Sequence, residues 1–267
     1  MIIDAHCHVW PDEIARKVLA DRPVGLDPVH DGTLDGLRRT MDTAGIDMAL
    51  TLAVANVGRT VQRTNEFVGR VDRSRFVPFG TVHPDLTVEE NLAALQDNGV
   101  VGVKLHPLFQ AVAFADERTR EILVALAEND IPVLAHVGSG GDAHQNERGT
   151  PKSLHEMMAK ITGLRLIAAH YGGYQVLDEA ERWSVGGNIH LETSWPPSMG
   201  DLPTDRVISI IRRHGADRVV FGSDWPMTDP ATEIAAIRAL GLTADEESGI
   251  LGNNLAKLLG ITLPSTD

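Results

Sequence analysis

The feature that most constrains the fold is a repeated alternation between short apolar segments and amphipathic ones. Strand-like segments include the opening run up to His8, and the others span residues 47–54, 76–82, 100–105, 131–135, 164–169, 188–193 and 218–222. Helical spacing of apolar residues, or helix start signals, follows these segments along the chain. Strands alternating with helices predict parallel βαβ units, and eight such units predict a (β/α)8 barrel of the α/β class. Because no segment resembles a linker, we expect a single domain over residues 1–267.

The main alternative is a doubly wound open sheet, which is disfavoured because no Gly-x-Gly-x-x-Gly follows the first strand. Residues 10–32 are rich in Pro, Asp and Gly and predict a long loop, a kind of segment that is usually functional in a compact domain. The last predicted helix begins at the Thr243-x-x-Glu246 capping box and ends at Gly260.

Composition limits the partners and the location of the protein. The hydrophobic content of 43% over 267 residues is enough for a substantial core. The net charge of −13 argues against nucleic acid and anionic membranes as partners, but it says nothing about the substrate. The partner that we expect is a small-molecule substrate. A single cysteine favours a reducing compartment, and neither a signal peptide nor an 18-residue apolar run is recognisable. We therefore predict a soluble cytoplasmic protein.

Unusual polar residues fall where the predicted strands end. His6 and His8 end the first strand, and residues i and i+2 of a strand point to the same side. The other strand-end residues are Lys104, His136, His170 and Asp224. In a barrel these ends meet at one mouth, where active sites are built. Imidazoles and a carboxylate suit one divalent ion, with Zn²⁺ expected and Fe²⁺, Mn²⁺ or Co²⁺ as competitors.

Each of these residues also has an ordinary structural interpretation. His136 and His170 could be core histidines, Asp224 could cap a helix, and Lys104 could be a solvated strand end. Their joint occurrence at the predicted mouth favours a metal site over these separate explanations.

A family resemblance rests on the whole set of motifs. They are His6-x-His8, Gly102-Val-Lys104-Leu-His106-Pro107, His136, His170-Tyr-Gly-Gly173, Phe221-Gly-Ser-Asp224-Trp-Pro226 and the stretch from Gly252 to Gly260. In order and spacing the chain resembles the amidohydrolase superfamily. It is most similar to the amidohydrolase-related branch that includes aminocarboxymuconate semialdehyde decarboxylase, resorcylate decarboxylases and pyrone-dicarboxylate lactonases.

The resemblance implies roles for individual residues. His6, His8, His136 and Asp224 match the ligands of a single metal, and His170 matches a histidine that acts on water or substrate. Lys104 matches a position that is a carboxylated, metal-bridging lysine in binuclear relatives. An unmodified lysine beside one metal is the preferred interpretation here, and some lactonases of this branch work without metal.

The leading functional hypothesis is metal-dependent hydrolysis of a small lactone, amide or ester by a metal-activated water. Asp224 would accept the water proton, His170 would hold or protonate the substrate, and Lys104 or His106 would stabilise the oxyanion. Alternatives are non-oxidative decarboxylation of an unsaturated or aromatic acid and a non-catalytic, ligand-binding barrel.

Three further residues are predicted to contribute to substrate binding. Trp10 and Trp225 flank proposed ligands and could form walls of the pocket, and Arg59 could hold a carboxylate. Homo-oligomers are common among such barrels, so we also expect that the protein could form a homo-oligomer.

Overall fold

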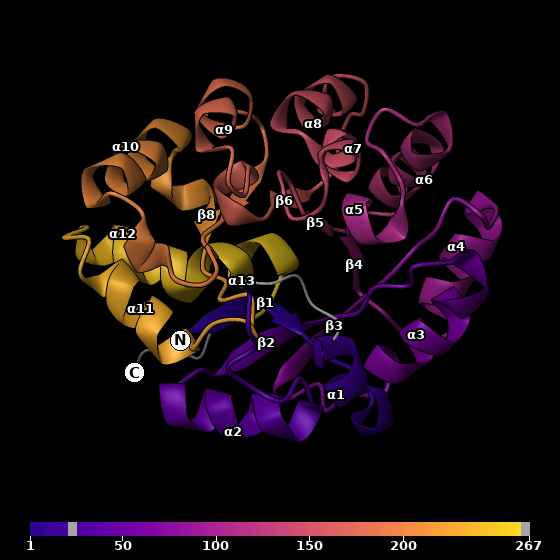
Figure 1. Ribbon diagram of the computed structural model, residues 1–267, viewed down its shortest axis with the longest axis horizontal. Coiled ribbons are helices and arrows are strands. Elements are labelled where there is room, and N and C mark those ends of the chain that lie inside the picture. Colours follow the sequence, from indigo (N-terminus) through magenta and orange to yellow (C-terminus); the bar gives the residue numbers. More distant parts are fainter. Residues whose placement is uncertain (21–25, 263–267) are drawn as a thin grey trace. The chain divides into compact units, whose positions relative to one another are not determined.

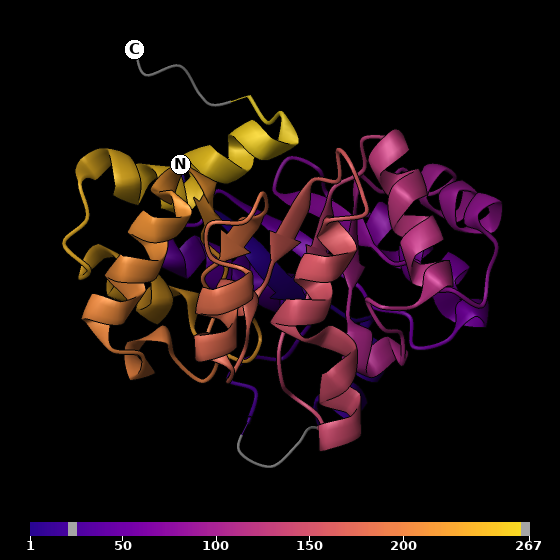
Figure 2. The same ribbon diagram turned by 90° about the horizontal axis from the view of Figure 1, so that it is seen from above.

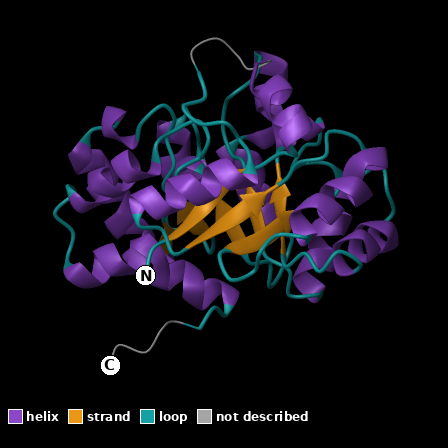
Figure 3. Ribbon diagram, turned by 90° about the horizontal axis from the view of Figure 1, so that it is seen from below, coloured by secondary structure: helices purple, strands orange, loops and turns teal. Residues whose placement is uncertain are grey.

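The computed structural model describes residues 1–20 and 26–262 and contains one eight-stranded sheet (Figure 1). The strands follow chain order from β1 to β8, and each is followed by helical segments (Figure 3). Their bounds are β1 (Ile3–His8), β2 (Met48–Leu52), β3 (Phe76–Gly80), β4 (Gly102–Leu105), β5 (Val133–Ala135), β6 (Leu166–Ala168), β7 (His190–Glu192) and β8 (Val219–Val220). The predicted (β/α)8 barrel is confirmed, with every predicted strand present.

The helices lie largely where apolar periodicity and capping residues predict them. The α-helices are α1 (Asp12–Ala20), α2 (Leu34–Ala44), α3 (Val61–Gly69), α4 (Val88–Gln96), α5 (Pro107–Gln110), α6 (Glu117–Glu128), α7 (Ala143–Asn146), α8 (Pro151–Met158), α9 (Leu177–Trp183), α10 (Thr204–His214), α11 (Pro230–Arg238), α12 (Ala244–Ser248) and α13 (Asn254–Leu259). Shorter turns of helix are η1 (Gly58–Thr60), η2 (Glu147–Gly149), η3 (His170–Gly172), η4 (Met199–Asp201), η5 (Ala216–Arg218) and η6 (Gly249–Asn253).

The prediction of an uninterrupted loop over residues 10–32 is wrong, because α1 lies within it. Its first turn carries Asp12 and Glu13, which favour a helix N-terminus, and Ala15 and Leu19 are buried at i and i+4. The part of the predicted loop at 21–25 lies outside the described residues. The long helix predicted up to Gly260 is present as α12, η6 and α13, with a π-helical segment in its middle.

Contacts divide the chain into two compact units. The first comprises residues 1–51, 73–77 and 192–267, and the second comprises residues 52–72 and 78–191. The prediction of one domain over the whole chain stays a prediction.

Within the first unit, backbone hydrogen bonds join β1 to its neighbours on both sides. Ala5 N donates to Phe221 O at 2.9 Å beside β8, and Asp47 N donates to Ile2 O at 3.0 Å beside β2. The start of β1 also lies close to the helical segments at the end of the chain (Figure 2). A Cβ on Gly252 of η6 would come within 2.4 Å of the Met1 carbonyl oxygen. The His-x-His sequence that ends β1 is therefore held on a strand fixed by its neighbours.

Within the second unit, β3 to β7 pair in parallel register. Lys104 of β4 is opposite Leu134 of β5, which is opposite Ile167 of β6. Both β5 and β6 are buried along their whole length, as expected for strands covered on both faces. The residues after these strands, His136 and His170, are thus placed at carboxyl ends.

Across the described residues, no helix has the length and apolarity that a membrane span requires.

Candidate metal and catalytic site

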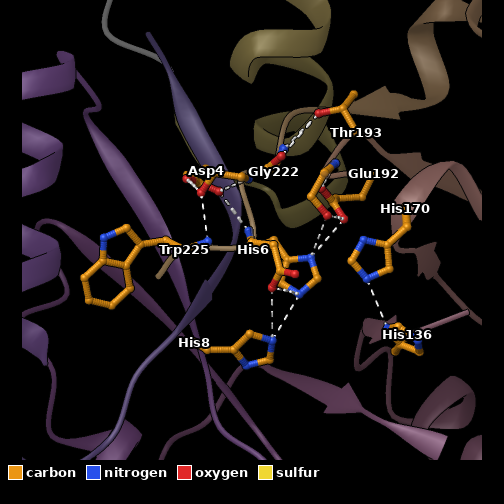
Figure 4. Close-up of polar contacts among 12 residues, drawn as sticks. Asp4, His6, His8, His136, His170, Glu192, Thr193, Gly222 and Trp225 are labelled. Atoms are coloured by element: carbon orange, nitrogen blue, oxygen red, sulfur yellow. Dashed lines mark hydrogen bonds and ion pairs between the residues drawn. The ribbon is translucent and has the colours of Figure 1, made fainter. Parts of the chain in front are cut away.

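A cluster in the first unit brings together His6, His8 and Asp224. Figure 4 shows the two histidine side chains of this cluster next to each other. His6 Nε2 lies 3.2 Å from His8 Nε2 and 3.3 Å from Asp224 Oδ1. His8 Nε2 lies 3.5 Å from the same Asp224 oxygen. These three atoms therefore form a triangle of nitrogen and oxygen donors, which we call the donor triangle. The expectation that His6 and His8 project together from β1 is confirmed.

The chemistry of the donor triangle fits a divalent cation. Ligand atoms of a tetrahedral metal with bonds of 2.0–2.1 Å are about 3.4 Å apart, whereas adjacent ligands at right angles with the same bond length are about 2.9 Å apart. The triangle has sides of 3.2, 3.3 and 3.5 Å, closer to the tetrahedral value. His6, His8 and Asp224 are all buried, so water cannot fully solvate their polar atoms.

Two residues from the end of β7 hold the other side of the His6 ring. His6 Nδ1 lies 2.9 Å from Glu192 Oε2, and the two side chains are 1% and 0% exposed. Ser194 Oγ donates to the same carboxylate oxygen at 2.8 Å, and the backbone N–H of Ser194 donates to the other oxygen. The carboxylate therefore has donors at both oxygens and joins β7 to the His6 ring.

Asp224 is positioned by a network that starts on β1. Asp4 Oδ1 accepts the N–H groups of His6 and Ser223 at 2.9 and 3.0 Å, and Oδ2 accepts Ser223 Oγ–H at 2.6 Å. Burial raises the pKa of Asp4 to about 6, while the hydrogen bonds from Ser223 and His6 oppose that rise. Asp224 itself has a φ of 65°, a left-handed conformation uncommon for a non-glycine residue and often found at functional sites.

Capping of a helix does not explain Asp224. The helix after β8 is α11, which begins at Pro230 with Asp229 at its N-cap. Asp224 instead directs Oδ1 at the two imidazoles of the donor triangle.

A second cluster lies within the second unit and joins His136 to His170. His136 Nδ1 is 3.0 Å from His170 Nε2 (Figure 4). His136 Nε2 is 2.8 Å from the carbonyl oxygen of Ser139. Burial and then the positive charge of Lys104 lower the pKa of His136 to about 3, so His136 is neutral at pH 7. A carbonyl can only accept, so the His136 proton is on Nε2 and Nδ1 accepts a proton donated by His170 Nε2.

Aromatic stacking fixes the plane of His136. His106 stacks on His136 with centroids 4.3 Å apart and on Phe109 with centroids 3.9 Å apart. His106 Nδ1 also accepts the Phe109 backbone N–H at 3.4 Å.

Lys104 is fully buried on β4, so the alternative of a solvated strand end is wrong. These contacts bring three predicted site residues, Lys104, His106 and His136, into one environment.

The predicted substrate-binding residues have different surroundings. Trp10 is half-buried and stacks on His8 with ring centroids 5.9 Å apart, so it contacts a donor-triangle residue. Trp225 is fully buried, stacks on His30 and donates Nε1–H to Thr40 Oγ1 at 3.3 Å. Arg59 is exposed on η1. A substrate-binding role for each of the three stays a prediction.

Glu192, Ser194 and Asp4 are site residues that the sequence reasoning did not identify. Glu192 lies inside a strand-like segment, where one acid is unremarkable. Asp4 lies two residues before His6 on β1, so strand parity alone could have indicated that it shares a face with the two histidines. Nothing local in the sequence indicates that Glu192 contacts His6, which lies 186 residues away.

Comparison with known protein families identifies the family of this chain. The family model described as Amidohydrolase matches residues 3–261, nearly the whole sequence. Among curated proteins, none matches the chain significantly.

Solved structures share the fold at low sequence identity. An uncharacterised TIM-barrel protein from Bordetella bronchiseptica is 20% identical, covers 97% of this chain and 98% of its own, and has a TM-score of 0.75. A dihydroxybenzoic acid decarboxylase from Polaromonas sp. JS666, with bound manganese and the inhibitor 2-nitroresorcinol, is 18% identical over 98% of each chain, with a TM-score of 0.74. A probable 2-pyrone-4,6-dicarboxylic acid hydrolase from Acinetobacter baumannii, with citric acid bound, is 18% identical over 97% of this chain and 99% of its own, with a TM-score of 0.71. At these identities the likeness extends to the fold alone.

Proposed function

Because the chain belongs to the amidohydrolase family, we propose that it is a metal-dependent enzyme that hydrolyses a small lactone, amide or ester. The observation that carries the proposal is the buried donor triangle of His6, His8 and Asp224. Two imidazoles and one carboxylate are ligands that suit a divalent ion, and Zn²⁺ is the ion we propose. Such an ion, when bound, supplies Lewis acidity that polarises a carbonyl oxygen and lowers the pKa of water.

The residues of the donor triangle have a direct role in handling protons. Asp224 directs one carboxylate oxygen at the imidazoles, and we propose that its carboxylate accepts the proton of the attacking water. Replacement of Asp224 by Asn keeps an oxygen donor but removes the base. We expect the Asp224→Asn protein to lose turnover by about 10²-fold or more.

The His136–His170 pair is proposed to act on the same substrate, since barrel enzymes draw catalytic residues from the ends of several strands. His136 can use its Nδ1 lone pair either for the hydrogen bond from His170 or as a metal ligand, but not for both. Ligation by His136 would therefore release the Nε2 proton of His170 for the substrate. Lys104 or His106 would stabilise the negative charge that develops on the carbonyl oxygen.

The test begins with metal content, measured by mass spectrometry on protein purified without added metal. The His8→Ala protein serves as the comparison, because it lacks one corner of the donor triangle. About one ion per wild-type chain, lost in the variant together with activity on a panel of lactones, esters and amides, is the expected result. A folded wild-type protein that hydrolyses such substrates with no metal would contradict the metal-dependent part of the proposal.

Non-oxidative decarboxylation of an aromatic acid is the second candidate, supported by the structural likeness to a manganese-containing dihydroxybenzoic acid decarboxylase. The two reactions differ in the bond that breaks. Decarboxylation releases carbon dioxide and puts a solvent proton on the carbon that carried the carboxyl group, whereas hydrolysis adds water across the acyl bond. Reaction in D2O therefore separates them, because a deuterium atom on that carbon identifies decarboxylation.

A further inference from the structure

The environment of the His6 ring defines a role for a residue outside the donor triangle. We propose that Glu192 is a positioning residue that fixes the tautomer of His6, so that its Nε2 lone pair faces the donor triangle. The inference rests on the proposed function only in its consequence for metal affinity. It is carried by the 2.9 Å contact between His6 Nδ1 and Glu192 Oε2, made by two side chains that are 1% and 0% exposed.

The direction of the hydrogen bond between Glu192 and His6 follows from the other partners of Glu192. The backbone N–H of Ser194 donates to Oε1, and Ser194 Oγ–H donates to Oε2. Both oxygens of Glu192 thus accept hydrogen bonds from Ser194. The hydrogen between Glu192 and His6 therefore belongs to His6 Nδ1.

The tautomer then decides what His6 offers on its other side. A neutral imidazole with its proton on Nδ1 has a lone pair on Nε2. That lone pair points toward His8 Nε2 at 3.2 Å and Asp224 Oδ1 at 3.3 Å. Since a carboxylate oxygen cannot donate, the contact with Asp224 is favourable only when a proton or a metal ion lies between the two atoms. A carboxylate behind a ligating histidine also increases the basicity of the ring.

The backbone of the next strand leaves room for the Glu192 carboxylate. Gly222, just after β8, has no side chain, and a Cβ at this position would lie 2.2 Å from Glu192 Oε1. Thr193 Oγ1 accepts the Gly222 N–H at 3.2 Å, which keeps the two segments in register (Figure 4). Gly222 therefore supports the position of Glu192, and replacing it offers a second way to disturb that position.

The test compares Glu192→Gln with a matched control, Glu233→Gln, which changes another buried glutamate of the same unit that contacts Ser198 and Met199. Imidazole ¹⁵N chemical shifts of the metal-free protein report the tautomer, and comparison with His6→Ala assigns the His6 signals. Zn²⁺ affinity is measured by competition with a chromophoric chelator. We expect His6 to be protonated at Nδ1 in the wild type and the control. In Glu192→Gln we expect a shift toward the Nε2–H tautomer, with Zn²⁺ affinity about 10–100-fold weaker.

Each outcome bears on a separate statement. A wild-type His6 protonated at Nε2, or a Glu192→Gln protein with an unchanged tautomer and unchanged Zn²⁺ affinity, would overturn the role of Glu192. A wild-type protein that has the expected tautomer but binds no Zn²⁺ would uphold that role and refute the proposed metal dependence. If Glu192→Gln does not fold, Gly222→Ala, which displaces Glu192 but retains it, must show the same shift for the proposal to stand.

Discussion

Glu233 should make the stability of the protein fall as the pH rises through neutrality. This side chain of α11 is 2% exposed and accepts hydrogen bonds from Ser198 Oγ at 3.1 Å and Met199 N at 3.0 Å. Burial raises its pKa from 4.5 to about 7, against the lowering effect of those two hydrogen bonds, and the charges of Glu192 and Asp4 contribute to the rise. The folded protein therefore binds a proton between pH 4.5 and 7 that the unfolded chain has already released.

The size and sign of the effect follow from this difference in pKa. One pKa unit corresponds to about 1.4 kcal/mol, so the shift from 4.5 to about 7 amounts to about 3 kcal/mol. Because the folded state has the higher pKa, the free energy of unfolding decreases by up to this amount as the pH rises from about 4.5 to 8. Above that range the contribution is constant.

The matched variant is Glu233→Gln, which keeps the shape of the side chain, and its carbonyl oxygen can still accept the Met199 N–H. Urea unfolding of both proteins at intervals between pH 4.5 and 8 isolates the contribution of Glu233, since other titrating groups are common to both. The variant should gain about 3 kcal/mol relative to the wild type across this range. A difference between the two proteins that stays constant with pH would refute a raised pKa at Glu233.

Three further predictions concern the residues around the donor triangle. Removing the metal with a chelator should lower the Tm of the wild-type protein by about 5–10 °C in a thermal shift assay, when the free metal concentration before chelation is near 100-fold above Kd. The Tm of the His8→Ala protein should not change. Gly222→Ala should lower the free energy of unfolding in urea by about 3–5 kcal/mol, because the new Cβ would lie 2.2 Å from Glu192 Oε1 and force apart a charge-assisted hydrogen bond. An unaltered unfolding midpoint would contradict the close approach of Gly222 and Glu192. Ser223→Ala removes the Oγ–H that Asp4 accepts at 2.6 Å and should cost about 1.5–3 kcal/mol by the same measurement, whereas a neutral effect would indicate a replacement donor.

The fold could be predicted because each strand ends in a recognisable change of composition. The apolar runs 131–135 and 166–169 each stop at a histidine, and parallel pairing then places both histidines at carboxyl ends. Treating residues 10–32 as one loop overlooks α1, because most of their Pro, Asp and Gly residues lie outside Asp12–Ala20, where Ala15 and Leu19 form a buried pair. Local composition was therefore a reliable guide to the strands and a poor guide within a mixed segment.

The site could be predicted only in part, because its support comes from contacts distant in sequence. His6, His8 and Asp224 are conspicuous since each follows or ends an apolar strand. Glu192 is not, because its importance depends on a histidine 186 residues earlier. The space it occupies also depends on Gly222, whose missing side chain has meaning only once β7 and β8 are side by side.

The charges in the first unit support the proposal that the donor triangle holds a divalent ion. Glu192 and Asp224 both contact the His6 ring, and both are buried. With His6 and His8 neutral, this arrangement holds two negative charges away from water, which is costly without compensation. A proton on one imidazole would balance only one of them. A divalent cation held by His6, His8 and Asp224, as proposed, would balance both charges, so binding of the ion would also offset the cost of burying the carboxylates.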